Sequence, residues 1–156
     1  MDKDYLSWWQ VEKASNQLAL LCKDYNPDVI VGIARGGLIP AVMVSHTYKK
    51  RLIYVDAKFY KDIEDRDKEP IIRSSLSGEV ESKKVLIIDD VVDTGKTLKT
   101  IMNHVKERDP ESIMTAALVT KPHAEMKPDQ YIFKTDRWVV FPWENFPVEK
   151  QMEEEE

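Results

Sequence analysis

The fold of this chain is decided by residues 85–97, which read VLIIDDVVDTGKT. The first four residues, Val85–Ile88, form an apolar and mostly β-branched run of the kind that makes a buried strand. Two adjacent carboxylates follow, Asp89 and Asp90, and a third, Asp93, precedes a Thr-Gly-Lys-Thr turn. Apolar side chains at helical spacing come next, so we predict a strand, an acidic loop and a helix in direct succession.

This succession predicts a site for a phosphorylated sugar and a divalent cation. In an open α/β sheet, ligands bind outside the carboxyl ends of the strands, where Asp89 and Asp90 are expected. Adjacent carboxylates accept hydrogen bonds from sugar hydroxyls and help to hold Mg²⁺, commonly through water because this ion keeps part of its hydration shell. The N–H groups and dipole of a helix that begins near Thr97 favour a phosphate, and Gly95 lets the backbone approach it closely.

Two other interpretations of this stretch are weaker. Gly95–Thr97 ends like the phosphate loop of P-loop NTPases, but that loop requires a glycine at position 90, where this chain has an aspartate that would repel phosphate. The stretch could also be an Asp-rich turn that only caps a helix, since Asp and Thr are good caps. Three carboxylates and two threonines around one glycine exceed what a cap needs, so we favour a binding site.

The rest of the chain alternates between strands and helices, which predicts an α/β fold with a parallel sheet covered on both faces. A capping box at Ser7–Gln10 begins a helix whose apolar residues, Leu21 among them, repeat as far as Tyr25. Further helices are expected up to about residue 48 and over 97–108. Strands are expected at 28–34, 51–57, 85–89 and 112–119, with short strands near 131–133 and 138–140 that complete the sheet.

Two segments depart from this alternation. Residues 59–83 form a long insertion with eight charged residues among the nine at 61–69, which is typical of a lid or a disordered loop. Residues 151–156 form an acidic tail, which we expect to be disordered. Residues 1–150 are therefore expected to form a single domain.

Composition narrows the range of partners. The net charge of the 156-residue chain is −5, and the four glutamates at 153–156 supply −4 of it. The folded part is thus nearly neutral, which argues against a nucleic-acid partner, and the apolar runs are too short to span a membrane. The single cysteine, Cys22, excludes an internal disulfide, so we expect a cytoplasmic location and a buried thiol. His46, His104 and His123 lack metal-ligand spacing and are expected to have structural roles.

Residues 85–97 resemble the phosphoribosyl-pyrophosphate (PRPP) signature of type I phosphoribosyltransferases. The resemblance extends to residues 32–38 (GIARGGL), 120–122 (TKP) and 138–144 (WVVFPWE). In this order and in so short a chain, these blocks are similar to the small xanthine-guanine and hypoxanthine phosphoribosyltransferases of bacteria and archaea. The fold implied is a mostly parallel sheet flanked by helices, with a flexible lid loop and a small hood that binds the base.

The resemblance implies roles for the residues that bind PRPP. Asp89 and Asp90 correspond to the acids that bind the ribose hydroxyls and the metal. Asp93 corresponds to the acid near purine N7, the proposed general base or acid. Arg35 and Gly36 lie on the loop that binds pyrophosphate. The loop that holds the 5′-phosphate corresponds to Asp93, Thr94, Gly95, Lys96 and Thr97.

The resemblance also implies how the base and the metal are bound. Lys121 corresponds to the lysine that donates to O6 of the purine, Trp138 to the aromatic residue that stacks on the base, and Val139 to the residue whose backbone reads the base edge. Glu144 corresponds to an acid near the base and the metal. Val140 differs from the polar residue of some xanthine-guanine members and cannot accept a hydrogen bond from a purine 2-amino group.

The activity implied is transfer of the phosphoribosyl group from PRPP to hypoxanthine, guanine or xanthine, with Mg²⁺ as cofactor, in a homodimer or homotetramer. A phosphoribosyltransferase for adenine or a pyrimidine is one alternative, and Lys121 and Trp138 favour 6-oxopurines over it. A nucleic-acid-binding regulator that kept the fold is another. It would need a basic face, against which the nearly neutral body argues.

Overall fold

The computed structural model of this chain describes residues 2–58, 69–145 and 152–153. Its main sheet has six strands in the order β4-β3-β2-β5-β6-β7, and every neighbouring pair is parallel except β3 and β4. The strands are β2 (Val29–Ala34), β3 (Arg51–Lys58), β4 (Ile71–Ser74), β5 (Lys84–Val92), β6 (Ser112–Thr120) and β7 (Gln130–Lys134).

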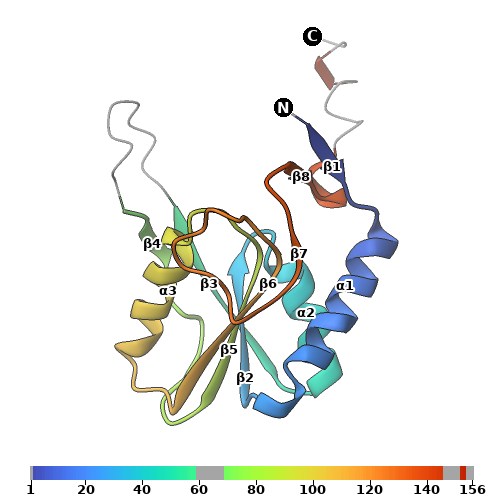
Figure 1. The fold of residues 1–156 in the computed structure, drawn as a ribbon. Coiled ribbons are helices and arrows are strands. Elements are labelled where there is room, and N and C mark those ends of the chain that lie inside the picture. The colour runs from blue at the N-terminus through green and yellow to red at the C-terminus, as the bar shows by residue number, and fades with distance from the viewer. Residues whose placement is uncertain (1, 59–68, 146–151, 154–156) are drawn as a thin grey trace.

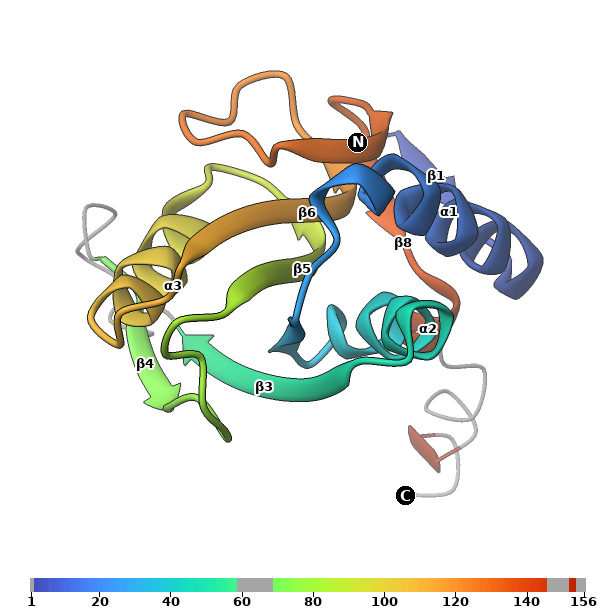
Figure 2. The same ribbon diagram turned by 90° about the horizontal axis from the view of Figure 1, so that it is seen from below.

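Three helices cover the sheet on both faces (Figures 1 and 2). Helices α1 (Trp8–Leu21) and α2 (Leu38–Tyr48) lie on one face, and α3 (Lys96–Lys106) lies on the other. The α/β fold predicted from the alternating pattern is therefore confirmed. None of the helices in the described part of the chain is long and apolar enough to cross a membrane.

Strand β5 separates two hydrophobic cores because its side chains alternate between the faces of the sheet. Leu86 and Ile88 belong to the core under α1 and α2, whereas Val85 and Ile87 belong to the core under α3. All four side chains are completely buried. This continuous apolar run fixes β5 in the middle of the sheet, and so determines where the acids that follow it lie.

The first helix begins as predicted and ends earlier. The Gln10 N–H donates to Oγ of Ser7 at 3.1 Å, and the Ser7 N–H donates to Oε1 of Gln10 at 2.8 Å, which completes the capping box. Helix α1 ends at Leu21, and a short 3₁₀ helix, Lys23–Tyr25, follows. The predictions of a helix through Tyr25 and of a buried Leu21 were wrong, because Leu21 lies at the edge of the buried stripe of α1 and is 47% exposed. Cys22 follows the buried Leu18 by four positions and is buried, as predicted.

Two predicted segments pair differently from expectation. Strand β8 (Trp138–Val140) does not complete the main sheet but pairs in parallel with β1 (Lys3–Tyr5) in a separate two-stranded sheet, because the N-terminal segment offers it a free edge. The described part of the 59–83 insertion contains β4, an antiparallel partner of β3 that the sequence did not predict. Residues 59–68 of the predicted lid, and the predicted tail apart from 152–153, lie outside the described residues. The extent of the domain, residues 1–150, stays a prediction.

Candidate active site

The two adjacent acids lie near the carboxyl end of β5, as predicted, although the strand continues to Val92 and not only to Asp89. The Asp90 N–H donates to Oδ1 of Asp89 at 2.9 Å, and the Val91 N–H donates to Oδ1 of Asp90 at 2.8 Å. Asp89 is only 8% exposed. Burial, and then the neighbouring charge of Asp90, raise the pKa of Asp89 well above its ordinary value. Two carboxylates thus lie side by side in a poorly solvated place, an arrangement that a cation would stabilise.

The loop between β2 and α2 packs directly on these acids. A Cβ atom at Gly36 would overlap the carboxylate of Asp90, and a Cβ at Gly37 would lie 2.6 Å from the carbonyl oxygen of Ile33 and 3.0 Å from Cα of Asp89. Only glycines allow such an approach. The fold therefore brings the Arg35-Gly36-Gly37 loop, in which Arg35 is exposed, to the acid pair. The role of this loop in binding pyrophosphate stays a prediction.

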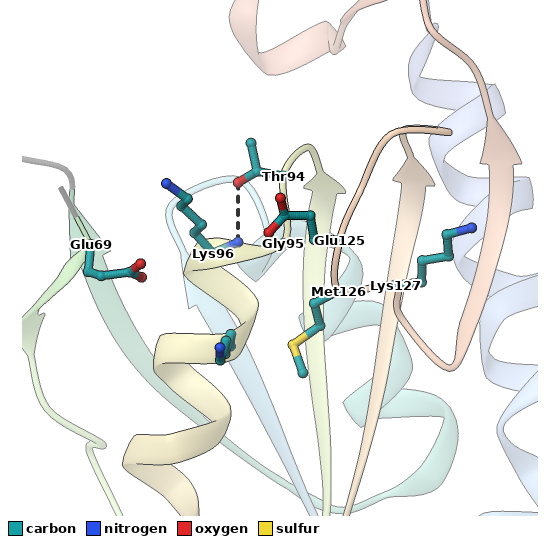
Figure 3. A pocket seen from close by; sticks show the side chains of 8 residues that line it. Glu69, Thr94, Gly95, Lys96, Glu125, Met126 and Lys127 are labelled. Atoms are coloured by element: carbon teal, nitrogen blue, oxygen red, sulfur yellow. Dashed lines mark hydrogen bonds between the residues drawn. The ribbon is translucent and has the colours of Figure 1, made fainter. Parts of the chain in front are cut away.

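The turn after β5 has the features of an anion-binding turn. Helix α3 begins at Lys96, one residue earlier than predicted, and Gly95 precedes it with a left-handed φ of 91°. The Lys96 N–H donates to Oγ1 of Thr94 at 3.2 Å, which tightens the turn (Figure 3). A cavity of about 170 Å³ is lined by Asp89 and by residues between Val91 and Leu98. This cavity joins Asp89 to the turn.

A larger cavity of about 470 Å³ borders the same turn (Figure 3). It opens between the start of α3 and the loop after β6, and its walls carry both positive and negative side chains. Figure 3 shows Glu69 on one side of the start of α3 and Glu125 and Met126 on the other. Its lining residues are Glu69, Thr94, Gly95, Lys96, Lys99, Glu125, Met126 and Lys127.

The residues predicted to bind the base lie just after β6 and on β8. Lys121 is buried. Its backbone N–H donates to the carbonyl oxygen of Val92 at 2.9 Å, and its side-chain ammonium group donates to the carbonyl oxygen of Arg137. Arg137 immediately precedes Trp138, whose side chain is 53% exposed, whereas Val139 is buried. An exposed aromatic ring beside a buried lysine can stack on a planar ligand while the lysine hydrogen-bonds its edge.

The β1–β8 sheet and the 3₁₀ helix Pro142–Glu144, here called the hood, adjoin Phe141, which is buried in the core under α1 and α2. The ring of Trp143 stacks on Phe141 with centroids 4.6 Å apart. Oε2 of Glu144 accepts a hydrogen bond from the Phe141 N–H at 3.1 Å, so Glu144 caps the 3₁₀ helix. No group of three or more His, Cys, Asp or Glu side chains in the described ranges is arranged to hold a metal. The metal role of Glu144 stays a prediction.

Sequence reasoning missed one residue of the site. His123 was expected to have a structural role, but its Nε2 lies 2.6 Å from Oδ1 of Asp93. The two are thirty positions apart, and no spacing rule connects them, so only the fold could reveal the contact. His104 does have a structural role, because its Nε2 accepts a hydrogen bond from the Leu76 N–H at 3.2 Å.

Comparisons with known proteins agree with this geometry. A family model described as phosphoribosyl transferase domain matches residues 3–153. A curated xanthine-guanine phosphoribosyltransferase from Cereibacter sphaeroides is 32% identical over 148 residues, which cover 90% of this chain and 86% of that protein. A purine phosphoribosyltransferase structure from Pyrococcus horikoshii is 48% identical, with a TM-score of 0.86 and coverage of 95% of this chain and 97% of the other. A xanthine-guanine-hypoxanthine phosphoribosyltransferase from Helicobacter pylori, 21% identical with a TM-score of 0.82, covers 99% of this chain and 100% of that one and shares the fold. The chain therefore belongs to the phosphoribosyltransferase family.

Proposed function

We propose that this phosphoribosyltransferase transfers the 5-phosphoribosyl group of PRPP to a 6-oxopurine, giving a purine nucleoside 5′-monophosphate and pyrophosphate. The observation that carries the proposal is the packing of the Arg35–Gly37 loop on Asp89 and Asp90, next to the turn that begins α3. In this proposal the loop binds the pyrophosphate, the two acids bind the ribose, and the turn binds the 5′-phosphate, so that the three parts of PRPP occupy adjoining sites. The names of the relatives from Cereibacter and Pyrococcus support a purine as the acceptor.

The parts of PRPP are assigned to neighbouring groups of the site. Asp89 and Asp90 accept hydrogen bonds from the ribose hydroxyls. The backbone N–H groups of Thr94–Thr97, together with the dipole at the start of α3, bind the 5′-phosphate. Arg35, with the N–H groups of its loop, binds the pyrophosphate, whose negative charge grows as the bond to C1 breaks.

Mg²⁺ fits this donor set. A magnesium ion needs only one or two carboxylates, because water and substrate phosphate oxygens fill its other positions. Asp89 and Asp90 supply two, and their mutual repulsion is relieved by a cation. When bound, the ion neutralises charge on the leaving pyrophosphate. Glu144 is the further acid that would approach the metal or its water.

The base is assigned to the side of the site near the hood. Trp138 stacks on the purine, the backbone of Val139 contacts its edge, and Lys121 releases the Arg137 carbonyl oxygen and donates to O6 of the base. A lysine donates and cannot accept, so it selects a carbonyl over the amino group of adenine. Asp93 takes the proton that the purine loses as it bonds to the ribose.

The test is product formation from PRPP and Mg²⁺ with each of five bases: hypoxanthine, guanine, xanthine, adenine and uracil. We expect nucleotides from one or more of the first three. Absence of product with every base would refute the enzymatic proposal and favour a regulator with this fold. Product mainly from adenine would refute the role of Lys121. Because Val140 is apolar, the ratio of guanine to hypoxanthine turnover tests whether this position reads the 2-amino group.

We further propose a cytoplasmic homo-oligomer. The single cysteine is typical of a chain that works in a reducing compartment. Trp8 and Trp9, on the first turn of α1, are 57% and 65% exposed, and aromatic side chains are enriched at subunit interfaces. Light scattering coupled to gel filtration measures the assembly directly, and a monomer at micromolar concentration would refute it.

A further inference from the structure

The loop that follows β6 is fastened to the turn that follows β5. The Lys121 N–H donates to the carbonyl oxygen of Val92, and the Glu125 N–H donates to the carbonyl oxygen of Thr94, each at 2.9 Å. These two bonds bracket position 123 on one segment and position 93 on the other. His123 therefore faces Asp93 because the backbones are paired there, and not because one side chain adopted a chance rotamer.

Close packing beside these bonds makes the arrangement rigid. Ala124 is 5% exposed, and its N–H donates to the carbonyl oxygen of Lys121 at 3.2 Å, which closes a turn around His123. A Cβ atom at Gly95 would lie 2.7 Å from Cβ of Met126, so the two segments touch where only a glycine fits. The imidazole is thus carried by a loop that cannot shift without disturbing the phosphate turn.

The contact between His123 and Asp93 has a defined direction. An ionised carboxylate only accepts hydrogen bonds, so Nε2 of His123 donates to Oδ1 of Asp93 across 2.6 Å. Oδ2 of Asp93 has no hydrogen-bond partner among the residues that the structure describes. The two side chains are 59% and 64% exposed, so this bond contributes little to the stability of the fold. Its effect is on the orientation of the carboxylate.

We propose that His123 is a positioning residue for the base-proton step: it holds Oδ1 of Asp93 so that Oδ2 faces the nitrogen of the purine. This inference rests on the proposed function, in which Asp93 receives that proton. It adds a residue that acts through Asp93 and does not itself touch the base. In this arrangement the general base, Asp93, is oriented by a further side chain, that of His123.

The proton balance of the step is simple. N9 of a 6-oxopurine forms the bond to C1 of the ribose while the bond from C1 to the pyrophosphate oxygen breaks, and pyrophosphate leaves with the electron pair. The purine loses its N7 proton to Oδ2 of Asp93, which becomes a neutral carboxylic acid. His123 keeps its proton on Nε2 throughout, and Asp93 later releases the acquired proton to water.

The experiment compares three variants with the wild-type protein. His123→Phe removes the donor but keeps a planar ring, His123→Gln keeps a donor near the position of Nε2, and His46→Gln is the matched control, because His46 is an exposed residue of α2. We expect His123→Phe to lower kcat about tenfold, since one hydrogen bond to a charged group is lost. His123→Gln should keep most of the activity, KM for PRPP should not change in either variant, and His46→Gln should match the wild type.

A second purine substrate, 8-azahypoxanthine, distinguishes a positioning role of His123 from a merely structural one. In 8-azahypoxanthine, nitrogen replaces the C8–H group and makes the ring proton more acidic, so its transfer depends less on Asp93. We expect the loss in His123→Phe to be clearly smaller with this base than with hypoxanthine. Equal losses with both bases and in both His123 variants, with a raised KM for PRPP, would overturn the inference in favour of a structural role. Wild-type kcat in His123→Phe would also overturn it.

A spectroscopic readout does not depend on turnover. In ¹⁵N-labelled protein without substrate, we expect the ring of His123 to carry its proton on Nε2, and its resonances to move in Asp93→Asn while those of His46 stay in place. No shift in that variant would overturn the inference even if His123→Phe fails to fold. Absence of product from wild-type protein with every base would instead refute the proposed function.

Discussion

A Cβ atom at position 36 would lie 2.7 Å from Cγ of Asp90, so the backbone of Gly36 and the carboxylate of Asp90 occupy adjoining space. The Asp90 side chain cannot easily retreat, because its Oδ1 accepts a hydrogen bond from the Val91 N–H. The Arg35–Gly37 loop and the acid pair thus form one packed unit. A change in either should affect the binding of the same substrate.

The first prediction concerns this contact. Gly36→Ala should displace Asp90 or the loop, lower the free energy of unfolding by about 1–3 kcal/mol, and sharply raise KM for PRPP. Gly78→Ala is the control, because a Cβ there would lie 2.7 Å from Cγ2 of Ile53, away from the acids. It should lower stability but leave KM unchanged. Urea unfolding and initial-rate kinetics measure both, and an unchanged KM in Gly36→Ala would contradict the packed unit.

The second prediction follows from the raised pKa of Asp89. The folded protein disfavours the ionised form of Asp89. The contribution of Asp89 to the free energy of unfolding therefore falls as pH rises through its raised folded-state pKa. In EDTA and without substrate, Asp89→Asn should therefore be more stable than the wild type at pH 8, and the difference should shrink towards pH 4. Urea unfolding across this range measures it. A difference that does not vary with pH would contradict the burial argument.

The third prediction separates the function of these acids from the fold. Asp89→Asn combined with Asp90→Asn should abolish turnover, because the ribose hydroxyls lose their charged hydrogen-bond acceptors and Mg²⁺ loses its two carboxylate ligands. The circular dichroism spectrum should remain that of the wild type, since the amides keep the shape of the carboxyl groups. Turnover near the wild-type rate in the double variant would contradict the proposed role of both residues in binding the ribose and the metal.

The fourth prediction concerns Cys22. Burial, and then the charge of Asp129, raise the pKa of its thiol to about 11, and the side chain is completely buried. The thiolate is the reactive form, so a thiol reagent should label Cys22 only when the protein unfolds. Leu18→Ala, which leaves a cavity in the same core, should lower stability by about 2–5 kcal/mol and speed labelling accordingly. Rapid labelling of the stable wild type would contradict this.

The fifth prediction concerns the ion pair that joins β1 to Arg137, the residue before β8. Nε of Arg137 lies 3.1 Å from Oδ1 of Asp4, and Arg137 immediately precedes Trp138. Asp4→Asn should raise KM for the base but not for PRPP, and cost less than about 1 kcal/mol of stability because the pair is partly exposed. Arg137→Gln and the double variant complete a thermodynamic cycle. Additive effects on KM would show that the pair does not orient the base site.

The strand-turn-helix unit at residues 85–97 could be predicted because its signals are local. An apolar run selects a buried strand, and Gly95 marks a turn before a helix whose Leu98, Ile101 and Val105 are indeed buried. Such signals depend on neighbours within a few positions, and a sequence displays them directly. The same reasoning failed at Leu21, which lies at the edge of the buried stripe of α1, and at β8, where a distant partner decided the pairing.

Short-range pattern and steric need in the sequence are enough to predict the α/β fold, the acids near the end of β5 and the glycines of the Arg35–Gly37 loop. The pairing of β1 with β8 and the contact of His123 with Asp93 became known only from the folded structure. Both depend on backbone hydrogen bonds between segments far apart in the chain. A local residue pattern does not encode those bonds, because every backbone offers the same N–H and C=O groups. Many pairings of segments would satisfy these groups equally well, and the packing of the sheet and its loops selects one of them.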